Sequence, residues 1–229
     1  MARSFNGTTD LVFNASATIT LALPYTIAAW FNASSLPGAY GTLLRHNNAA
    51  PGMFTRSSGK IAYAGGATLI DGSFILTTGV WTHALLADTG STAQGYINGV
   101  TDGASFASGG SSPQANLRIG NDLGNTNSYP GSLADVAAWN VTLSALEVSA
   151  LAKGARPSTV RPKSLVYWCP FDGLQSPEPD LSGNVLNGTL TGTNPAFGPP
   201  FAPFTPRWPQ FWFPPPPLPS FVLMPQIVM

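Results

Sequence analysis

Charged side chains are scarce in this sequence. Asp, Glu, Lys and Arg make up 9% of the 229 residues, whereas an ordinary soluble domain has about 25%. The ten basic and ten acidic residues cancel, so the chain lacks the basic excess that binding to nucleic acid phosphates requires. We therefore expect no nucleic acid partner and a surface built mainly from Ser, Thr, Asn and Gly.

Cysteine and histidine are also rare. The single cysteine, Cys169, excludes a disulfide within the chain, and its place in the apolar run SLVYWCPFD predicts a buried thiol. The two histidines are His46 and His83, and no Cys/His cluster has the spacing of a zinc site. His83 lies inside WTHALL, where we expect a core or sheet-edge histidine rather than a catalytic base.

Long apolar runs without proline are absent as well. Residues 208–229 are uncharged and long enough to cross a bilayer, but they include seven prolines. Each interior proline costs a spanning helix about 3 kcal/mol, so we expect no membrane span. The opening residues MARSFNGTTDLVFN hold no apolar segment typical of a secretory signal, so we expect synthesis and folding in a cytosol.

Short alternating apolar segments fill residues 1–153. They include SATITLALP, PYTIAAWF, GTLLRH, GKIAYAG, GSFILTTG and VWTHALLAD, and Gly, Asn, Ser and Pro separate them. Strands at intervals of about ten residues are typical of an antiparallel sandwich or barrel. Asn98-Gly99 adds a type I′ hairpin signal, because both turn residues tolerate positive φ. The pattern predicts an all-β fold.

One short helix interrupts the strands. In LSALEVSALAKG, Ser144 is a candidate N-cap and Glu147 a candidate partner three residues on, which together make a capping box. Leu143 and Val148 stand where a hydrophobic staple is expected, and Gly154 follows the last turn. Glu147 therefore has a structural role.

Several of these segments resemble laminin-G-like domains of the concanavalin A-like jelly rolls. The resemblance rests on WTHALLADTGSTAQGYINGV, on YPGSLADVAAWNVTLSALEVSAL and on the opening segments SFNGTTDLVF and TIAAWF. LVYWCPFDG and DLSGNVLNGTLTG resemble a strand and loop that usually begin such domains, but here they follow the helix. The resemblance implies one jelly-roll domain over residues 1–194, which leaves 195–229 as a separate arm.

The acidic residues argue against glycosidase chemistry. Glycoside hydrolysis needs two carboxylates that flank the scissile bond, and the E-x-D-x-x-E strand motif of glycosidases on this fold is missing. Glu147 is assigned to the helix cap, Glu178 lies between prolines in SPEPD, and most Asp residues stand in turn sequences such as DG. We therefore expect no enzymatic activity, with a glycoside hydrolase or lyase as the least favoured alternative.

Ligand binding is harder to read from the sequence. Sugar sites combine accessible aromatic rings with a few polar groups, and Tyr40, Tyr129 and Trp139 are conceivable platforms, although core packing is the commoner fate of strand aromatics. Some laminin-G-like domains bind calcium, and the NDLGN loop at 121–125 offers oxygen ligands without a definable set. We expect no cofactor apart from this calcium alternative.

The C-terminal arm, residues 195–229, combines twelve prolines with eight Phe or Trp residues and a single charge. Prolines hold a chain near polyproline II, so little entropy is lost on docking, and aromatic side chains serve as anchors. We predict that the arm binds a protein partner, with folding back on its own domain as the alternative. The anchoring residues are Phe201, Phe204, Trp208, Phe211, Trp212, Phe213, Pro214, Pro215, Pro216, Pro217 and Phe221.

These observations lead to a functional hypothesis. The missing catalytic motif, the low charge and the arm favour a non-catalytic structural protein of a virion, such as a capsid decoration or cement protein of a bacteriophage. In that hypothesis the arm anchors the jelly roll to capsid or to like subunits in an oligomer, and the protein is found on the virion surface. The alternative is an extracellular carbohydrate-binding adhesin or fibre module that recognises a surface glycan.

Overall fold

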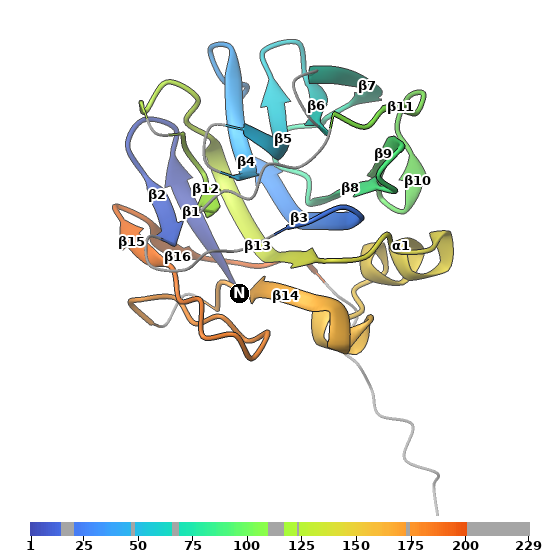
Figure 1. The fold of residues 1–229 in the computed structure, drawn as a ribbon. Helices are drawn as coiled ribbons and strands as arrows, with labels where there is room; N and C mark the ends of the chain where they lie inside the picture. Colours follow the sequence, from blue (N-terminus) through green and yellow to red (C-terminus); the bar gives the residue numbers. More distant parts are fainter. Residues whose placement is uncertain are drawn as a thin grey trace, which may run out of the picture.

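Figure 1 presents the computed structural model of the chain, which describes residues 1–14, 21–46, 49–65, 69–109, 117–122, 124–172 and 175–200, with the backbone alone at 49 and 50. Within these residues two antiparallel sheets pack face to face, and one short α-helix lies beside them. The predicted antiparallel β-sandwich with one helix is therefore confirmed.

The larger sheet has nine strands in the described part of the chain. Its main path runs β10-β9-β8-β3-β13-β1-β16, while β11 pairs with β9 and β14 pairs with β13. The strand β13 is central, because β3 covers one of its edges while β1 and β14 share the other. The bounds are β1 (Ala2–Asn6), β3 (Tyr25–Ala33), β8 (Thr82–Asp88), β9 (Thr92–Ile97), β10 (Val100–Thr101), β11 (Phe106–Ala107), β13 (Pro130–Trp139), β14 (Leu165–Cys169) and β16 (Asn194–Ala196).

The smaller sheet has seven strands in the described residues, in the order β15-β2-β12-β4-β5-β6-β7. Every pairing is antiparallel, and neighbouring residues along a strand alternate between the core and the outer face except at the β4 irregularity, where Leu43 and Leu44 both face the core. The bounds are β2 (Leu11–Asn14), β4 (Tyr40–His46), β5 (Ala49–Arg56), β6 (Lys60–Ala64), β7 (Leu69–Ile75), β12 (Leu117–Ile119) and β15 (Thr189–Thr191).

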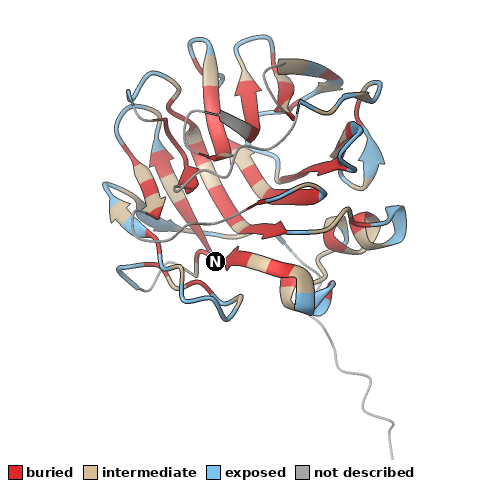
Figure 2. Ribbon diagram, in the orientation of Figure 1, coloured by how far each residue is buried: buried red, intermediate tan, exposed pale blue. Residues whose placement is uncertain are grey.

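The hydrophobic core lies between the two sheets. Figure 2 shows buried residues concentrated on the central strands, with exposed residues mainly in the connecting loops. Cys169 is fully buried and has no disulfide partner, and burial raises the pKa of its thiol well above the usual value. The predicted buried thiol is thus confirmed.

A second apolar cluster covers the outer face of the nine-stranded sheet. The helix α1 (Ala145–Ala152) and the short 3-10 helices η1 (Pro157–Thr159) and η2 (Pro162–Ser164) follow β13. Val148 and Leu151 of α1 pack with Leu85 and Trp139 of the sheet. This cover explains why every residue of β8 is buried, since neither of its faces meets solvent.

The capping box of α1 forms as predicted. Glu147 Oε2 accepts hydrogen bonds from the Ser144 amide (2.8 Å) and hydroxyl (2.7 Å), and the Ser144 side chain caps the Glu147 amide. Leu143 and Val148 are both buried. The helix ends at Ala152, and Gly154 has a φ of 92°, a left-handed conformation that glycine adopts without a Cβ clash.

We expect Ser144→Ala to lower the free energy of unfolding by about 1 kcal/mol, because it removes the N-cap acceptor. Urea unfolding followed by tryptophan fluorescence measures this change. Ser149→Ala, within the same helix, is the matched control and should be neutral or slightly stabilising, since Ala has the higher helix propensity. Equal effects at the two positions would contradict a capping role for Ser144.

Three segments differ from the sequence-based expectation. Ala49–Arg56 forms β5 inside the seven-stranded sheet despite Pro51 and Gly52, because pairing with β4 and β6 outweighs local propensity. Leu21–Pro24, expected at the end of a strand, has no strand pairing, and residues 15–20 of that segment lie outside the described residues. The strand β16 includes Pro195 and Ala196, the first residues assigned to the arm, and pairs with β1.

Candidate functional site

The outer face of the seven-stranded sheet carries an unusual set of side chains. Val12, Leu117 and Met53 point into the core, so Phe13, Arg118 and Phe54, each next to one of them along a strand, point outward. Arg45 joins this outward set because it is the register partner of Arg118. On this face Phe13 and Arg45 are half-buried, whereas Phe54 and Arg118 each keep only 6% of their surface exposed.

Cross-strand register places four residues in one row across this face. Phe13 of β2 is opposite Arg118 of β12, Arg118 is opposite Arg45 of β4, and Arg45 is opposite Gly52 of β5. The Arg118 guanidinium carbon lies 4.4 Å from the centre of the Phe13 ring, and that of Arg45 lies 5.5 Å from the centre of the Phe54 ring. Both distances are in the range of cation–π contacts. We call Phe13, Arg118 and Arg45, together with Phe54 two residues beyond Gly52 on β5, the arginine row.

Glycine is needed beside the row. A Cβ atom at Gly52 would lie 2.9 Å from an edge carbon of the Phe54 ring and 3.3 Å from Arg45 Cβ. Because Gly52 lacks this atom, the Phe54 ring can lie over the β5 backbone next to Arg45. Gly52, which weakened the strand signal in the sequence, therefore helps to shape the face.

A second group lies on the same face, toward the start of β4. Tyr40 is half-buried, and the Arg56 guanidinium carbon lies 4.6 Å from the centre of its ring. Arg56 forms an ion pair of 2.9 Å with Asp71, and these two side chains keep 30% and 35% of their surface exposed. The Tyr40 and Phe54 rings meet edge to face at 6.2 Å between centroids. We call Tyr40, Arg56 and Asp71 the tyrosine group.

The two groups differ in electrostatics. Asp71 neutralises Arg56 in the tyrosine group, whereas Arg118 and Arg45 stand opposite each other in the arginine row. Burial lowers the pKa of both the Arg45 and the Arg118 guanidinium, and Asp122 opposes this effect at each. The Asp122 carboxylate itself accepts hydrogen bonds from Thr126 and Asn127.

Of the three aromatic platforms predicted from the sequence, only Tyr40 is accessible. Trp139 and Tyr129 are fully buried, so both were wrong as platforms. The α1 and η1 cover encloses Trp139, whose indole donates to the Val160 carbonyl at 2.8 Å. Tyr129 packs in the main core against Phe5.

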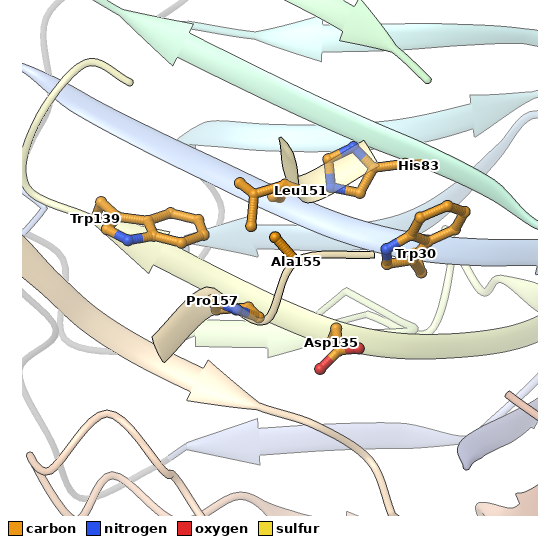
Figure 3. Close-up of a pocket in the computed structure, with 8 residues that line it drawn as sticks. Trp30, His83, Asp135, Trp139, Leu151, Ala155 and Pro157 are labelled. Carbon is orange, nitrogen blue, oxygen red and sulfur yellow. The ribbon is translucent and has the colours of Figure 1, made fainter. Parts of the chain in front are cut away.

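A small pocket lies on the other side of the sandwich, between the nine-stranded sheet and its helical cover. In Figure 3, Trp139 lies at one end, His83 and Trp30 lie at the other, and the helical segment's Leu151, Ala155 and Pro157 lie between them. The cavity volume is about 10 Å³, which by this measure is room for about one water molecule. The pocket is therefore too small to enclose a sugar ring.

Burial shifts the pKa of both ionisable groups of this pocket. Burial lowers the pKa of His83 to about 3, so its imidazole is neutral at physiological pH. Burial raises the pKa of Asp135, although the Trp168 indole donates to its carboxylate at 3.0 Å. His83 is a buried core-type histidine, as the sequence predicted.

Most acidic residues have a structural partner. Glu147 belongs to the helix cap, Glu178 is ion-paired with Arg3 at 2.5 Å, and Asp102 accepts from the Tyr63 hydroxyl at 2.8 Å and from two backbone amides. Asp180 accepts from Trp168, Ser182 and Leu186. Asp71, expected in a turn, instead belongs to β7. These contacts give each of these carboxylates a structural role.

Metal ligation was predicted only as an alternative. Among the described residues, no group of three or more His, Cys, Asp or Glu side chains is arranged to hold a metal ion. In the NDLGN loop, Asp122 accepts from Thr126 and Asn127, and Asn121 accepts from Ser128. Calcium binding in this loop stays a prediction.

The predicted anchoring residues of the arm, Phe201 to Phe221, lie outside the described residues. The binding of the arm to a partner, and its alternative of folding back, therefore stay predictions. Within the described part of the chain, no helix has the length and apolar character to cross a membrane.

The family model of the concanavalin A-like lectin/glucanases superfamily, Laminin_G_3, matches residues 5–149. This match covers more than half of the chain, and the chain belongs to that superfamily. The resemblance seen in the sequence is thereby confirmed. No curated protein matches the chain.

Solved structures with this fold include a proposed carbohydrate-binding protein from Bacteroides ovatus, at 18% identity and a TM-score of 0.67. That alignment covers 84% of this chain and 58% of the Bacteroides chain, so the present chain spans little more than half of that protein. A heptameric SAP-like pentraxin from Limulus polyphemus has 18% identity and a TM-score of 0.52, with 66% of this chain and 81% of the other covered.

Domain 4 of AbnA, an extracellular arabinanase from Geobacillus stearothermophilus solved in complex with arabinotriose, is also similar. It has 18% identity and a TM-score of 0.51, with 66% of this chain and 76% of that domain covered. At these identities the likeness shows the fold alone.

The arginine row was not found by sequence reasoning. A signal was present, because with only ten basic residues in the chain, an arginine inside an apolar strand such as GTLLRH or NLRIG stands out. The row itself could not be predicted, since Arg45 and Arg118 become neighbours only through the β4–β12 register.

Proposed function

We propose that the chain is a non-catalytic glycan-binding module whose binding surface is the outer face of the seven-stranded sheet. The observation that carries the proposal is the tyrosine group. Tyr40 on β4 offers a partly accessible ring, Arg56 on β5 offers hydrogen-bond donors and Asp71 on β7 offers acceptors.

This combination matches the chemistry of a sugar. A pyranose or furanose ring presents C–H groups on one face, which pack on an aromatic ring, and hydroxyl groups at its edge. The hydroxyls both donate and accept hydrogen bonds, and a paired Arg and Asp satisfy both needs. Because Arg56 is already stacked and ion-paired, little side-chain entropy remains to be lost on binding.

Similar proteins support the proposal. The Bacteroides protein is described as a proposed carbohydrate-binding protein, and the arabinanase domain was solved with arabinotriose. The superfamily contains both lectins and glucanases. The structural roles of Glu147, Glu178, Asp102 and Asp180 favour binding without turnover.

The virion decoration role predicted from the sequence rests on the arm. Its anchoring residues lie outside the described part of the chain. Protein partners, a homo-oligomer and a place on a virion surface stay predictions. They are compatible with glycan binding, since the arm and the sheet face are different parts of the chain.

A glycan screen followed by calorimetry tests the proposed function. We expect at least one oligosaccharide to bind saturably with one site per chain. Tyr40→Ala should weaken that binding about tenfold or more, since loss of an aromatic anchor typically costs about 2 kcal/mol.

Val100→Ala is the matched control, because Val100 is an exposed side chain of β10 in the other sheet. It should leave the affinity unchanged. The proposal would be overturned if no glycan bound, or if Tyr40→Ala and Val100→Ala bound glycan equally well.

A further inference from the structure

The arginine row contains two adjacent cations that form no ion pair with a carboxylate among the described residues, although Asp122 lies near enough to raise the pKa of both. The ion pairs of the described residues are Arg3–Glu178, Arg56–Asp71 and Arg161–Glu147, and none includes Arg45 or Arg118. All ten Asp and Glu residues of the sequence lie in the described ranges. No carboxylate side chain of the chain itself therefore neutralises this pair by an ion pair.

The pair is costly in the free protein. Like charges directly opposite each other on a sheet repel, and Arg118 is only 6% exposed. The Nε atoms of both arginines are buried and have no hydrogen-bond partner among the described residues. A buried donor without a partner is rare in native proteins and calls for an explanation.

The surroundings hold the guanidinium groups in place. Phe13 lies against Arg118 and Phe54 against Arg45, so aromatic rings flank the pair on both sides. Fixed, half-desolvated guanidinium groups bind oxyanions more strongly than solvated ones, because water competes less and less side-chain entropy is lost.

We propose that Arg45 and Arg118 bind the carboxylate of an acidic sugar residue, so that the module selects acidic over neutral glycans. This inference rests on the proposed function and names its ligand class. The planar fork of a guanidinium matches the two oxygens of a carboxylate, which favours this anion.

The position of the row favours an oligosaccharide over a small free anion. Tyr40 and Arg45 lie on the same strand, and a strand rises about 3.3 Å per residue, so the tyrosine group and the row are roughly 15 Å apart. One sugar chain that follows β4 would place a neutral ring on Tyr40 and an acidic residue at the row. Phe54 lies between them on the neighbouring strand, in contact with both groups.

Calorimetry with paired ligands tests the inference. The panel contains oligosaccharides of galacturonate, glucuronate and sialate, each compared with its own methyl ester, which keeps the rings and removes the charge. We expect at least one acid to bind about 10- to 100-fold more tightly than its ester, since hydrogen bonds to charged groups contribute about 1.5–3 kcal/mol. Raising the salt concentration should reduce this preference.

Variants separate the two proposals. Arg118→Gln and Arg45→Gln should each abolish most of the preference for the acid, while Tyr40→Ala should weaken acid and ester alike. If acids and esters bind equally well, the inference is wrong and the proposed function stands. If nothing in the panel or the glycan screen binds, both fail. If a sulfated disaccharide binds and no carboxylated one does, the carboxylate assignment is overturned.

Thermal unfolding without ligand gives a second readout. If the pair serves a ligand, Arg118→Gln should not lower the melting temperature, because the substitution relieves like-charge repulsion in the free protein. A fall of several degrees would show that Arg118 is structural, against the inference. Loss of acid binding by a variant that melts at or above the wild-type temperature would support it.

Discussion

Replacing Arg3 by Gln should lower the free energy of unfolding by about 3–5 kcal/mol, because it removes the cation that is ion-paired with the buried Glu178 carboxylate. Arg3 is 5% exposed and Glu178 is fully buried. The Arg3 guanidinium also donates to the Gln175 carbonyl at 2.6 Å and to the Thr193 carbonyl at 3.5 Å. This single side chain thus links β1 to the segment that ends the described part of the chain.

Urea unfolding measures the effect, and two variants make it specific. Arg161→Gln removes the more exposed ion pair with Glu147 and should cost far less, because water and salt screen an exposed ion pair. The double variant Arg3→Met with Glu178→Leu replaces the buried pair by apolar groups, and it should recover most of the loss. If Arg3→Gln lowers the free energy of unfolding no more than Arg161→Gln does, the buried Arg3–Glu178 ion pair does not have the stabilising role proposed for it.

Sequence patterns predicted the local elements well where one local rule decides the structure. The capping box of Ser144 and Glu147 requires only residues three apart, and it forms as predicted. The hairpin at Asn98-Gly99 also forms, with φ angles of 49° and 83° at these two residues. Each signal is complete within a few residues, so tertiary contacts had little to override.

Burial on the outer faces could not be predicted in the same way. Trp139 and Tyr40 both occupy strand positions with neighbours of mixed polarity, yet Trp139 is fully buried and Tyr40 is accessible. The difference arises because α1 and η1 fold onto one sheet. Alternation tells which residues share a face, but it does not tell whether another element covers that face.

Long-range register accounts for the rest of the candidate site. Arg45 and Arg118 are far apart in the sequence and meet only because β12 pairs with β4. Leu21 shows the opposite case. Its alternating pattern predicted a strand, but Leu21 is buried in the core without any strand pairing. The superfamily was recognisable from motifs, whereas the residues proposed to bind a ligand required the sheet order.

Acidification should destabilise this protein through His83. Its pKa is about 3 in the folded chain because of burial, whereas an unfolded histidine titrates near 6.5. Below pH 6.5 the unfolded chain takes up a proton that the folded chain does not, so stability falls with pH until about pH 3. At pH 4.5 the loss from this residue is about 3 kcal/mol, at about 1.4 kcal/mol for each pH unit.

The test compares the wild type with His83→Gln by urea unfolding from pH 7 to pH 4.5. The wild type should lose about 3 kcal/mol more than the variant over this range, since every other titratable group is common to both proteins. The Arg161–Glu147 pair contributes little over this range, because the Arg161 hydrogen bond lowers the pKa of Glu147 to about 2 and the stabilising contribution of Glu147 is lost only below about pH 4.5. If the free energy of unfolding falls with pH equally in the two proteins, His83 is protonated in the folded chain. The pocket between the nine-stranded sheet and α1 would then admit water more freely than its small volume indicates.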